Sequence, residues 1–291
     1  MKSQLKLNMG GTTKKLLSTL SLAFFAIGVA QAAPADKWLT VSWGGNPFGN
    51  ELWDYSEGGG QSTNPRNINQ VTGLIQDVDY GLGGTLYACS TFNTNGIFAV
   101  TESTGAMTQI ATIPGLAEGD MTYDQQGNRL IVSMGPFDKN IYQVDLLNNN
   151  TVSLFYTATG YDDIQGLAAD AVGNIWGIHT MINSSGASEL IKWNGSGFTS
   201  YGALPGMGIN MGMDINSAGE IYALSNGGSL YKINPTFGAP VATQVDFVSN
   251  SLGEGYTGLA FKGDLVPEPS SLAVLGLGLI GVCSRRRKKN S

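Results

Sequence analysis

Side chains whose oxygen atoms could coordinate a cation recur along the chain, each just before a short apolar stretch. These side chains are Gln70 and Thr72, Glu118 and Asp120, Asp163 and Gln165, Asn210, and Glu254 and Thr257. Carboxylate and amide oxygens are the ligands that a hard cation such as Ca²⁺ requires. Ordinary loop polarity is the alternative interpretation, because loop residues lie at the surface in most proteins. The elements that carry these residues must therefore be identified.

Other chemistry is poorly represented in the sequence. The chain has no G-x-S-x-G, Walker, C-x-x-C or H-E-x-x-H motif. His179 is the only histidine, which excludes a multi-histidine metal site. It lies in the stretch HTMINSSGAS, where it is either an acid or base or a surface polar group.

A repeat organises the middle of the chain. Similar stretches begin at Leu74, Met121, Leu167, Met213 and, in broken form, Gly258, and their turn glycines are separated by 44, 46, 46 and 44 residues. Each unit has a short apolar stretch, a turn with a glycine, and a second apolar stretch, which predicts a β-hairpin. An alternating strand and a weaker fourth strand follow in each unit.

Four strands in about 45 residues are typical of a propeller blade. The sequence therefore predicts an all-β fold, a β-propeller of five four-stranded blades over residues 33–265. The broken repeat at Gly258 supplies one inner strand, and WLTVSW from Trp38 with ELWDYS from Glu51 would complete its blade. An open β-sandwich is the alternative, but it leaves the even spacing to chance.

The stretch GLAADAVGNIW from Gly166 resembles NHL-type and gluconolactonase-like propellers. The resemblance implies a divalent metal bound by a Glu, an Asn and an Asp on the face where the inner strands begin. By position these residues are Glu118, Asn210 and Asp163, and Glu254 is a further candidate.

Charge and aromatic content restrict the partners. Between Ala33 and Leu265 there are seven Lys and Arg against twenty-one acids, a formal charge of −14. Such a surface repels a phosphate backbone, so nucleic acid is disfavoured, whereas cations and neutral glycans are compatible. The five tryptophans could stack on sugars or pack between blades: Trp38, Trp43, Trp53, Trp176 and Trp193.

The two ends of the chain carry targeting features. Residues 1–32 have a basic start, an apolar core and an Ala30-Gln31-Ala32 cleavage site, which predicts a secretory signal peptide. Only two cysteines are present, Cys89 and Cys283, so an exported domain would have to rest on its hydrophobic core. Residues 271–283 form a short apolar stretch followed by five basic residues, which predicts a transient inner-membrane anchor with its basic end inside.

This tail, residues 266–291, resembles the PEP-CTERM sorting signal of Gram-negative bacteria. The resemblance rests on Val266-Pro267-Glu268-Pro269, the apolar stretch and Arg285-Arg286-Arg287, in that order. It implies processing by an exosortase and delivery to the cell envelope, the outer surface or an exopolysaccharide matrix. We therefore expect a sorted propeller that acts as a binding or structural module. The alternative is a metal-dependent lactonase- or lyase-like enzyme on the same scaffold.

Overall fold

The computed structural model describes residues 37–43, 50–56, 58–68, 73–91, 95–136, 138–161, 163–180, 188–207, 210–249 and 255–263. The chain divides into two compact units, residues 1–35 and 36–291, and every described residue belongs to the second. The proposed signal peptide and the sorting segment lie outside the described residues.

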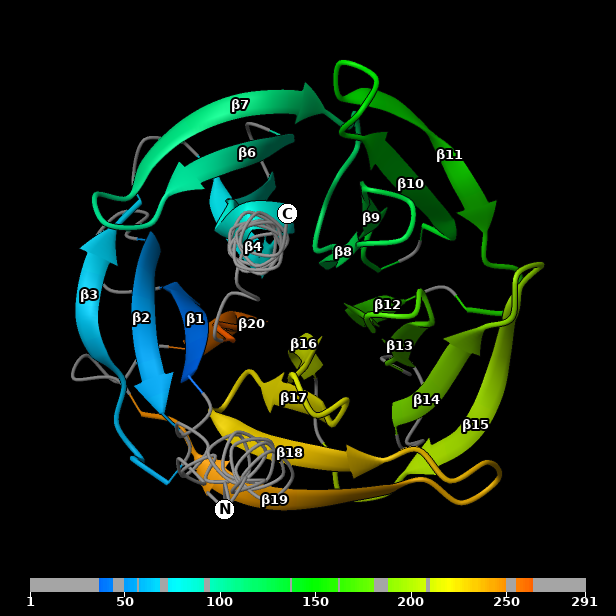
Figure 1. Cartoon of the computed structure of the whole chain (residues 1–291). Helices are drawn as coiled ribbons and strands as arrows, with labels where there is room; N and C mark the ends of the chain where they lie inside the picture. Colours follow the sequence, from blue (N-terminus) through cyan, green and yellow to red (C-terminus); the bar gives the residue numbers. More distant parts are fainter. Residues whose placement is uncertain are drawn as a thin grey trace, which may run out of the picture. The chain divides into compact units, whose positions relative to one another are not determined.

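Five four-stranded antiparallel sheets form the blades of a β-propeller (Figure 1), as the repeat predicts. Blade 1 contains β4 (Leu74–Tyr80), β5 (Leu86–Thr91), β6 (Gly96–Thr101) and β7 (Ala106–Thr112), with a short 3-10 helix, η1 (Leu82–Gly84), in its first turn. Blade 2 contains β8 (Met121–Asp124), β9 (Arg129–Ser133), β10 (Asn140–Asp145) and β11 (Thr151–Thr157). Blade 3 contains β12 (Ile164–Ala169), β13 (Ile175–His179), β14 (Ser188–Trp193) and β15 (Phe198–Leu204).

Blade 4 contains β16 (Asn210–Ile215), β17 (Ile221–Ser225), β18 (Ser229–Asn234) and β19 (Val241–Phe247). Blade 5 combines both ends of the propeller: β20 (Gly255–Phe261) is its inner strand, and β1 (Lys37–Trp43), β2 (Asn50–Ser56) and β3 (Thr63–Asn67) follow outward. Trp38 of β1 pairs with Phe261 of β20, and Trp43 pairs with Gly255. The predicted closure of the last blade by N-terminal strands is confirmed.

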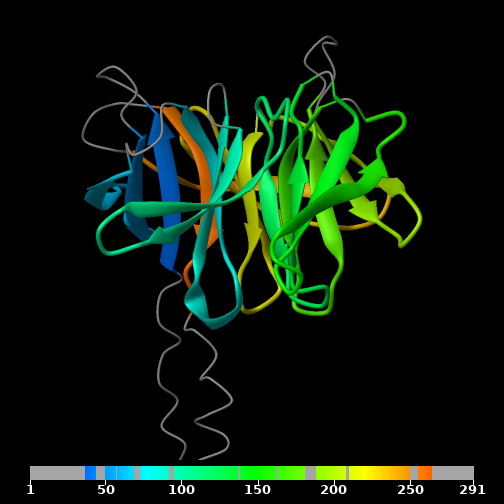
Figure 2. The ribbon, with the colours of Figure 1, turned by 90° about the horizontal axis from the view of Figure 1, so that it is seen from above.

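The inner strands β4, β8, β12, β16 and β20 contact one another in sequence around the centre of the ring. Four antiparallel strands return the chain to the end at which a blade began. The inner strands therefore all begin at the same end of the blades, which we call the loop end. They finish at the opposite end, which we call the turn end, toward which lie the turns between the first and second strands of blades 1 to 4 and the turns between the third and fourth strands (Figure 2). β20 ends and β1 begins at the turn end, so the start of the propeller's first strand lies beside the end of its last strand.

Five apolar clusters fill the interfaces between neighbouring blades. One cluster, for example, joins Leu39 of β1 to Val78 of β4, and another joins Ala168 of β12 to Met213 of β16. Inner strands such as β12 are almost wholly buried, whereas the outer strand β11 contains only exposed and half-buried residues. This gradient explains why inner strands have continuous apolar runs and outer strands are harder to recognise from sequence.

The hairpin turns use residues with a left-handed backbone. Gly83, Gly173 and Gly219 have φ of 72°, 86° and 79°. Glycine adopts such φ values with little steric strain because it has no Cβ atom. In blade 2 the left-handed residue is Asn128, with φ of 45°, rather than the aligned Gly127. Asparagine is the usual substitute at such positions, so the repeat is preserved with a one-residue shift.

Candidate functional site

The predicted metal ligands lie at the loop end where the structure describes them. Glu118 is half-buried in the segment leading into β8, and Asp163 is buried immediately before β12. Asn210 is the first residue of β16, but its side chain is outside what the structure describes, and so is the whole of Glu254. Among the described residues, no group of three or more His, Cys, Asp or Glu side chains is arranged to hold a metal ion. The four-residue calcium site therefore stays a prediction.

Asp120, which the sequence places beside Glu118, has a structural role. Its side chain is 2% exposed, and its oxygens accept hydrogen bonds from the backbone N–H of Met121 at 2.9 Å and of Leu167 at 2.6 Å. Leu167 belongs to the inner strand of the next blade. Asp120 therefore fastens blade 2 to blade 3 rather than facing solvent.

This kind of fastening recurs around the ring. In each case a polar side chain of one inner strand bonds the backbone of the next: Asp77 to Met121 N (3.0 Å), Asp79 to Tyr123 N (2.6 Å), Thr122 to Ala169 N (2.9 Å), Asp214 to Phe261 N, and Thr257 to Ile75 O (2.8 Å). We call Asp77, Asp79, Asp120 and Asp214 the fastening aspartates. Their partners lie on another blade, so their role could not be predicted from the sequence; the recurrence of Asp near the inner strands was the only available signal.

Burial in a ring of like charges disfavours ionisation of these carboxyls. Burial raises the pKa of Asp79 to about 6, despite hydrogen bonds from Tyr123, Tyr80 and Thr122 that favour its charged form. Burial likewise raises the pKa of Asp120 to about 7. The pKa values of Asp77 and Asp214 lie well above the usual range, because burial and the neighbouring carboxyls both oppose the charge.

His179 lies at the loop end of blade 3. Its Nδ1 is 3.6 Å from Oε2 of Glu189, and the ring of Tyr161 packs edge-on against the imidazole at 5.3 Å between centroids. Ser200 donates a hydrogen bond to the other oxygen of Glu189. Glu189 thus lies between the serine hydroxyl and the histidine, so the imidazole is not placed to take the serine proton. This order differs from a nucleophile-base-acid triad.

Tryptophans that the structure describes pack within and between blades. Trp38 is fully buried, with ring centroids 4.8 Å from Tyr222 and 5.0 Å from Phe261. The ring centroid of Trp193 lies 4.9 Å from that of Phe155 and 4.8 Å from that of Tyr156, both in the preceding blade. These rings form part of the apolar core between neighbouring blades. The side chain of Trp43 lies outside the described part of the chain.

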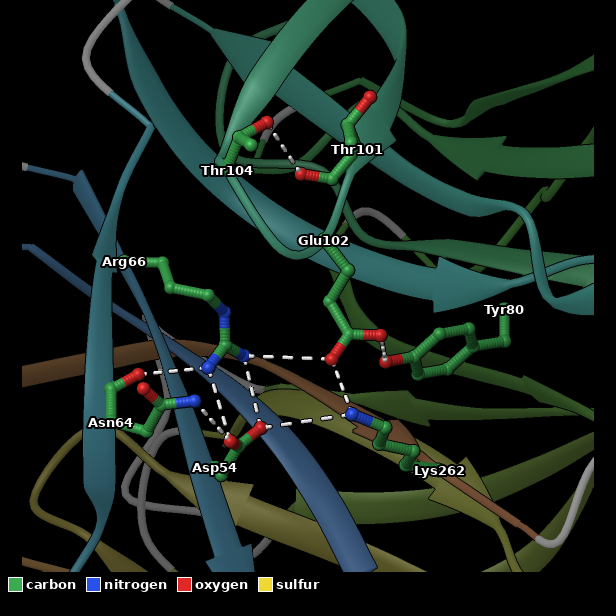
Figure 3. A network of polar contacts seen from close by, with 8 residues as sticks. All are labelled: Asp54, Asn64, Arg66, Tyr80, Thr101, Glu102, Thr104 and Lys262. Atoms are coloured by element: carbon green, nitrogen blue, oxygen red, sulfur yellow. Dashed lines mark hydrogen bonds and ion pairs between the residues drawn. The ribbon is translucent and has the colours of Figure 1, made fainter.

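A polar network at the turn end joins blade 5 to blade 1 (Figure 3). Arg66 of β3 makes a bidentate pair with Asp54 of β2, at 3.0 and 2.9 Å. Lys262, directly after β20, pairs with Glu102 of the β6–β7 turn, and Tyr80 donates to the same carboxylate at 2.7 Å. Lys262 lies one residue before the last described position, so this network anchors the chain where the propeller ends.

The electrostatics of this network favour its charged form. Burial alone would raise the pKa of Asp54, but hydrogen bonds from Arg66 and Asn64 outweigh burial and hold that pKa below its usual value. The Arg66 side chain is only 9% exposed, whereas Asp54 is 33% exposed, so the guanidinium is the better shielded partner. Removing Asp54 would leave a poorly solvated guanidinium.

Comparison with protein families assigns the segment that follows this network. Residues 265–288 match the PEP-CTERM protein-sorting motif. The chain carries this sorting motif. The PEP-CTERM match includes all the predicted sorting residues, from Val266 to Arg287, although their structure lies outside the described residues. None of the curated proteins matches the chain.

Solved structures support the fold. A chain of a nidogen/laminin complex aligns with a TM-score of 0.57 and 11% identity, covering 78% of this chain and 98% of that chain. A protein described as a gluconolactonase candidate aligns with a TM-score of 0.50 and 14% identity, covering 79% and 90%. At these identities the likeness establishes the propeller fold alone.

Within the part of the chain that the structure describes, no helix is long and apolar enough to cross a membrane. The predicted anchor, residues 271–283, lies outside that part.

Proposed function

We propose that this protein is an exported propeller that an exosortase processes at the inner membrane and delivers to the cell envelope or an exopolysaccharide matrix. The PEP-CTERM match at residues 265–288 carries this proposal. The propeller ends at the Lys262 network, immediately before that segment, so the Pro-Glu-Pro motif would be separated from the folded domain by only a few residues.

In its destination the propeller would act as a binding or structural module. Its aromatic side chains and fastening aspartates maintain the ring, and Glu189 separates Ser200 from His179, so these three residues do not form a nucleophile-base-acid triad. The acidic surface would exclude nucleic acid and tolerate neutral glycans.

The proposal predicts that the basic cluster is needed for processing. In a Gram-negative host with an exosortase, replacing Arg285, Arg286 and Arg287 with Gln should remove the charge that keeps this end of the segment inside. The processed form should then disappear from the envelope fraction, as measured by immunoblotting of fractionated cells. Lys139→Gln, a charge change of the same kind on the propeller, is the control and should leave the distribution unchanged.

The cleavage motif can be tested in the same host. Replacing Pro267, Glu268 and Pro269 with Ala should cause a precursor that retains the C-terminal segment to accumulate in the inner membrane. Mass spectrometry of the mature C-terminus would locate the cut. Normal processing of both sets of variants would refute exosortase sorting.

A further inference from the structure

The turn end of the propeller carries exposed apolar side chains at its hairpin tips. They are Leu82 in the β4–β5 turn, Leu147 in the β10–β11 turn, Val172 in the β12–β13 turn and Phe237 in the β18–β19 turn, at 65%, 79%, 76% and 69% exposure. Each of blades 1 to 4 contributes one. Hairpin tips are ordinarily polar. Phe237 packs edge-on against Tyr201 of β15, at 5.2 Å between ring centroids, yet it stays 69% exposed, so solvent alone gives no reason for this pattern.

The chain leaves the propeller at the same end. β20 finishes there, and eight residue steps separate Gly263 from Ser271, where the apolar segment begins. At no more than about 3.5 Å per residue, this connection spans at most roughly 28 Å. A segment held in a bilayer would therefore keep the turn end close to the membrane surface.

Charge distinguishes the two ends of the ring. At the turn end, Arg129, Lys232 and Lys262 each pair with an acid, while Asp145 and Asp170 add negative charge in the turns that carry Leu147 and Val172. At the loop end, the half-buried acids include Glu118, Asp138 and Glu189, and Lys139 is the one basic residue described there. An anionic phospholipid surface would repel the loop end more strongly than the turn end.

We propose that the turn end of the propeller rests on the lipid bilayer while the sorting segment is held in it, with Leu82, Leu147, Val172 and Phe237 inserted at the headgroup boundary. The proposal rests on the proposed function, because the sorting segment supplies the tether. The short tether gives the tips a high effective concentration at the surface, so a weak contact suffices. The loop end then faces away from the membrane.

Fluorescent probes on single cysteines would test this orientation. The full chain would be reconstituted in vesicles of phosphatidylethanolamine and phosphatidylglycerol that carry a quencher near the headgroups. Ala218→Cys reports on the turn end and Lys139→Cys on the loop end, both in a Cys283→Ser background. Burial raises the pKa of the Cys89 thiol, which keeps it protonated and unreactive. We expect several-fold stronger quenching at position 218 than at position 139.

Replacing the four tips with Ser should clearly reduce quenching at position 218, although the short connection still keeps this position nearer the surface than position 139. The matched control replaces Leu154 and Val241, which are exposed on the outer strands, with Ser and should leave the quenching unchanged. Unchanged thermal melting of both variants would show that the ring is intact.

A probe on native Cys283 separates the two proposals. If Cys283 is quenched but positions 218 and 139 are equally unquenched, the orientation is wrong and membrane insertion of the sorting segment stands. If Cys283 is also unquenched, membrane insertion fails, and the orientation fails with it.

Discussion

At the scale of single residues, the fastening aspartates combine two opposing requirements. Each must accept backbone hydrogen bonds across a blade interface, which favours a carboxylate, yet each is buried beside other carboxyls, which favours the protonated acid. The elevated pKa values show that burial dominates. The blade interfaces therefore hold protons near neutral pH that the unfolded chain would release.

The bound protons make stability depend on pH. In the folded protein burial raises the pKa values of Asp79 and Asp120 to about 6 and about 7, above the ordinary aspartate value of 3.8. At pH values between the ordinary aspartate pKa and these raised pKa values, the folded state binds more protons than the unfolded state. The free energy of unfolding therefore falls as pH rises through this range. We expect the melting temperature to be higher at about pH 5 than at about pH 8.5, by roughly 5 °C or more, measured by calorimetry.

Asp79→Asn should reduce this pH dependence, because the amide does not titrate. Asp145→Asn, in the β10–β11 turn and away from the ring centre, is the control and should preserve it. A melting temperature that rises steadily from pH 5 to 8.5 would contradict the assignment.

Contacts of single side chains were the least predictable part of the structure. Glu118 and Asp163 were located by their place in the repeat, and the structure puts both at the loop end. The role of Asp120 and the Arg66 network was not predicted. Asp120 bonds a backbone N–H 47 residues away, and Arg66 meets Glu102 across a blade interface, so neither contact has a local signature.

At the scale of elements, β1 is the strand that closes the ring. It pairs with β20 on one side and β2 on the other, and so joins residues about 220 positions apart in sequence. Trp38 adds a packed contact to blade 4 through Tyr222. The blade 4–blade 5 interface therefore depends strongly on one side chain from the start of the propeller.

Trp38→Ala should destabilise the propeller more than an average core substitution. Removing a fully buried tryptophan typically costs about 3–5 kcal/mol, which corresponds to a melting temperature roughly 6–20 °C lower for a domain of this size. Trp38→Phe keeps an aromatic ring against Tyr222 and Phe261 and should lose much less. Equal melting of Trp38→Ala and the parent would show that closure does not depend on this contact.

Deleting residues 37–56 removes two strands from blade 5 and exposes one edge of β20. We expect this truncation to aggregate or to melt well below the parent in a thermal-shift assay, because an isolated inner strand has lost its sheet. A soluble truncation with the parent's melting temperature would contradict the role of closure.

Most strands were predictable because the 45-residue repeat preserves one pattern of apolar stretch and turn. The sequence predicted two strands from the N-terminal segment, whereas the structure has three. The additional strand, β3, contains Pro65 and has few apolar residues, which argues against a strand. It is tolerated because β3 is the outer edge of blade 5, where a missing backbone N–H removes no ladder bond.

At the scale of the whole molecule, the two ends of the ring differ in charge and in connection to the chain. The turn end holds the start of β1, the end of β20 and most of the ion pairs of the described residues, while the loop end gathers half-buried acids with little basic compensation. Repulsion among acids at the loop end should weaken the native state, and a divalent cation would relieve it. The predicted calcium site follows from this asymmetry as well as from the positions of its four candidate residues.

Calcium should therefore stabilise the folded protein. Binding to the native state alone adds RT ln(1 + [L]/Kd), which is about 2.7 kcal/mol for millimolar Ca²⁺ at a site of ~10 μM. The melting temperature should rise by roughly 5–10 °C, and Mg²⁺ should have a smaller effect because it demands a tighter octahedron. Glu118→Gln combined with Asp163→Asn should abolish most of the rise. Asp145→Asn combined with Asp170→Asn, at the turn end, removes the same charge and should leave the rise intact. An equal calcium effect in both double variants would mean that general charge screening, rather than a loop-end site, is responsible, and no effect in the parent would exclude the site.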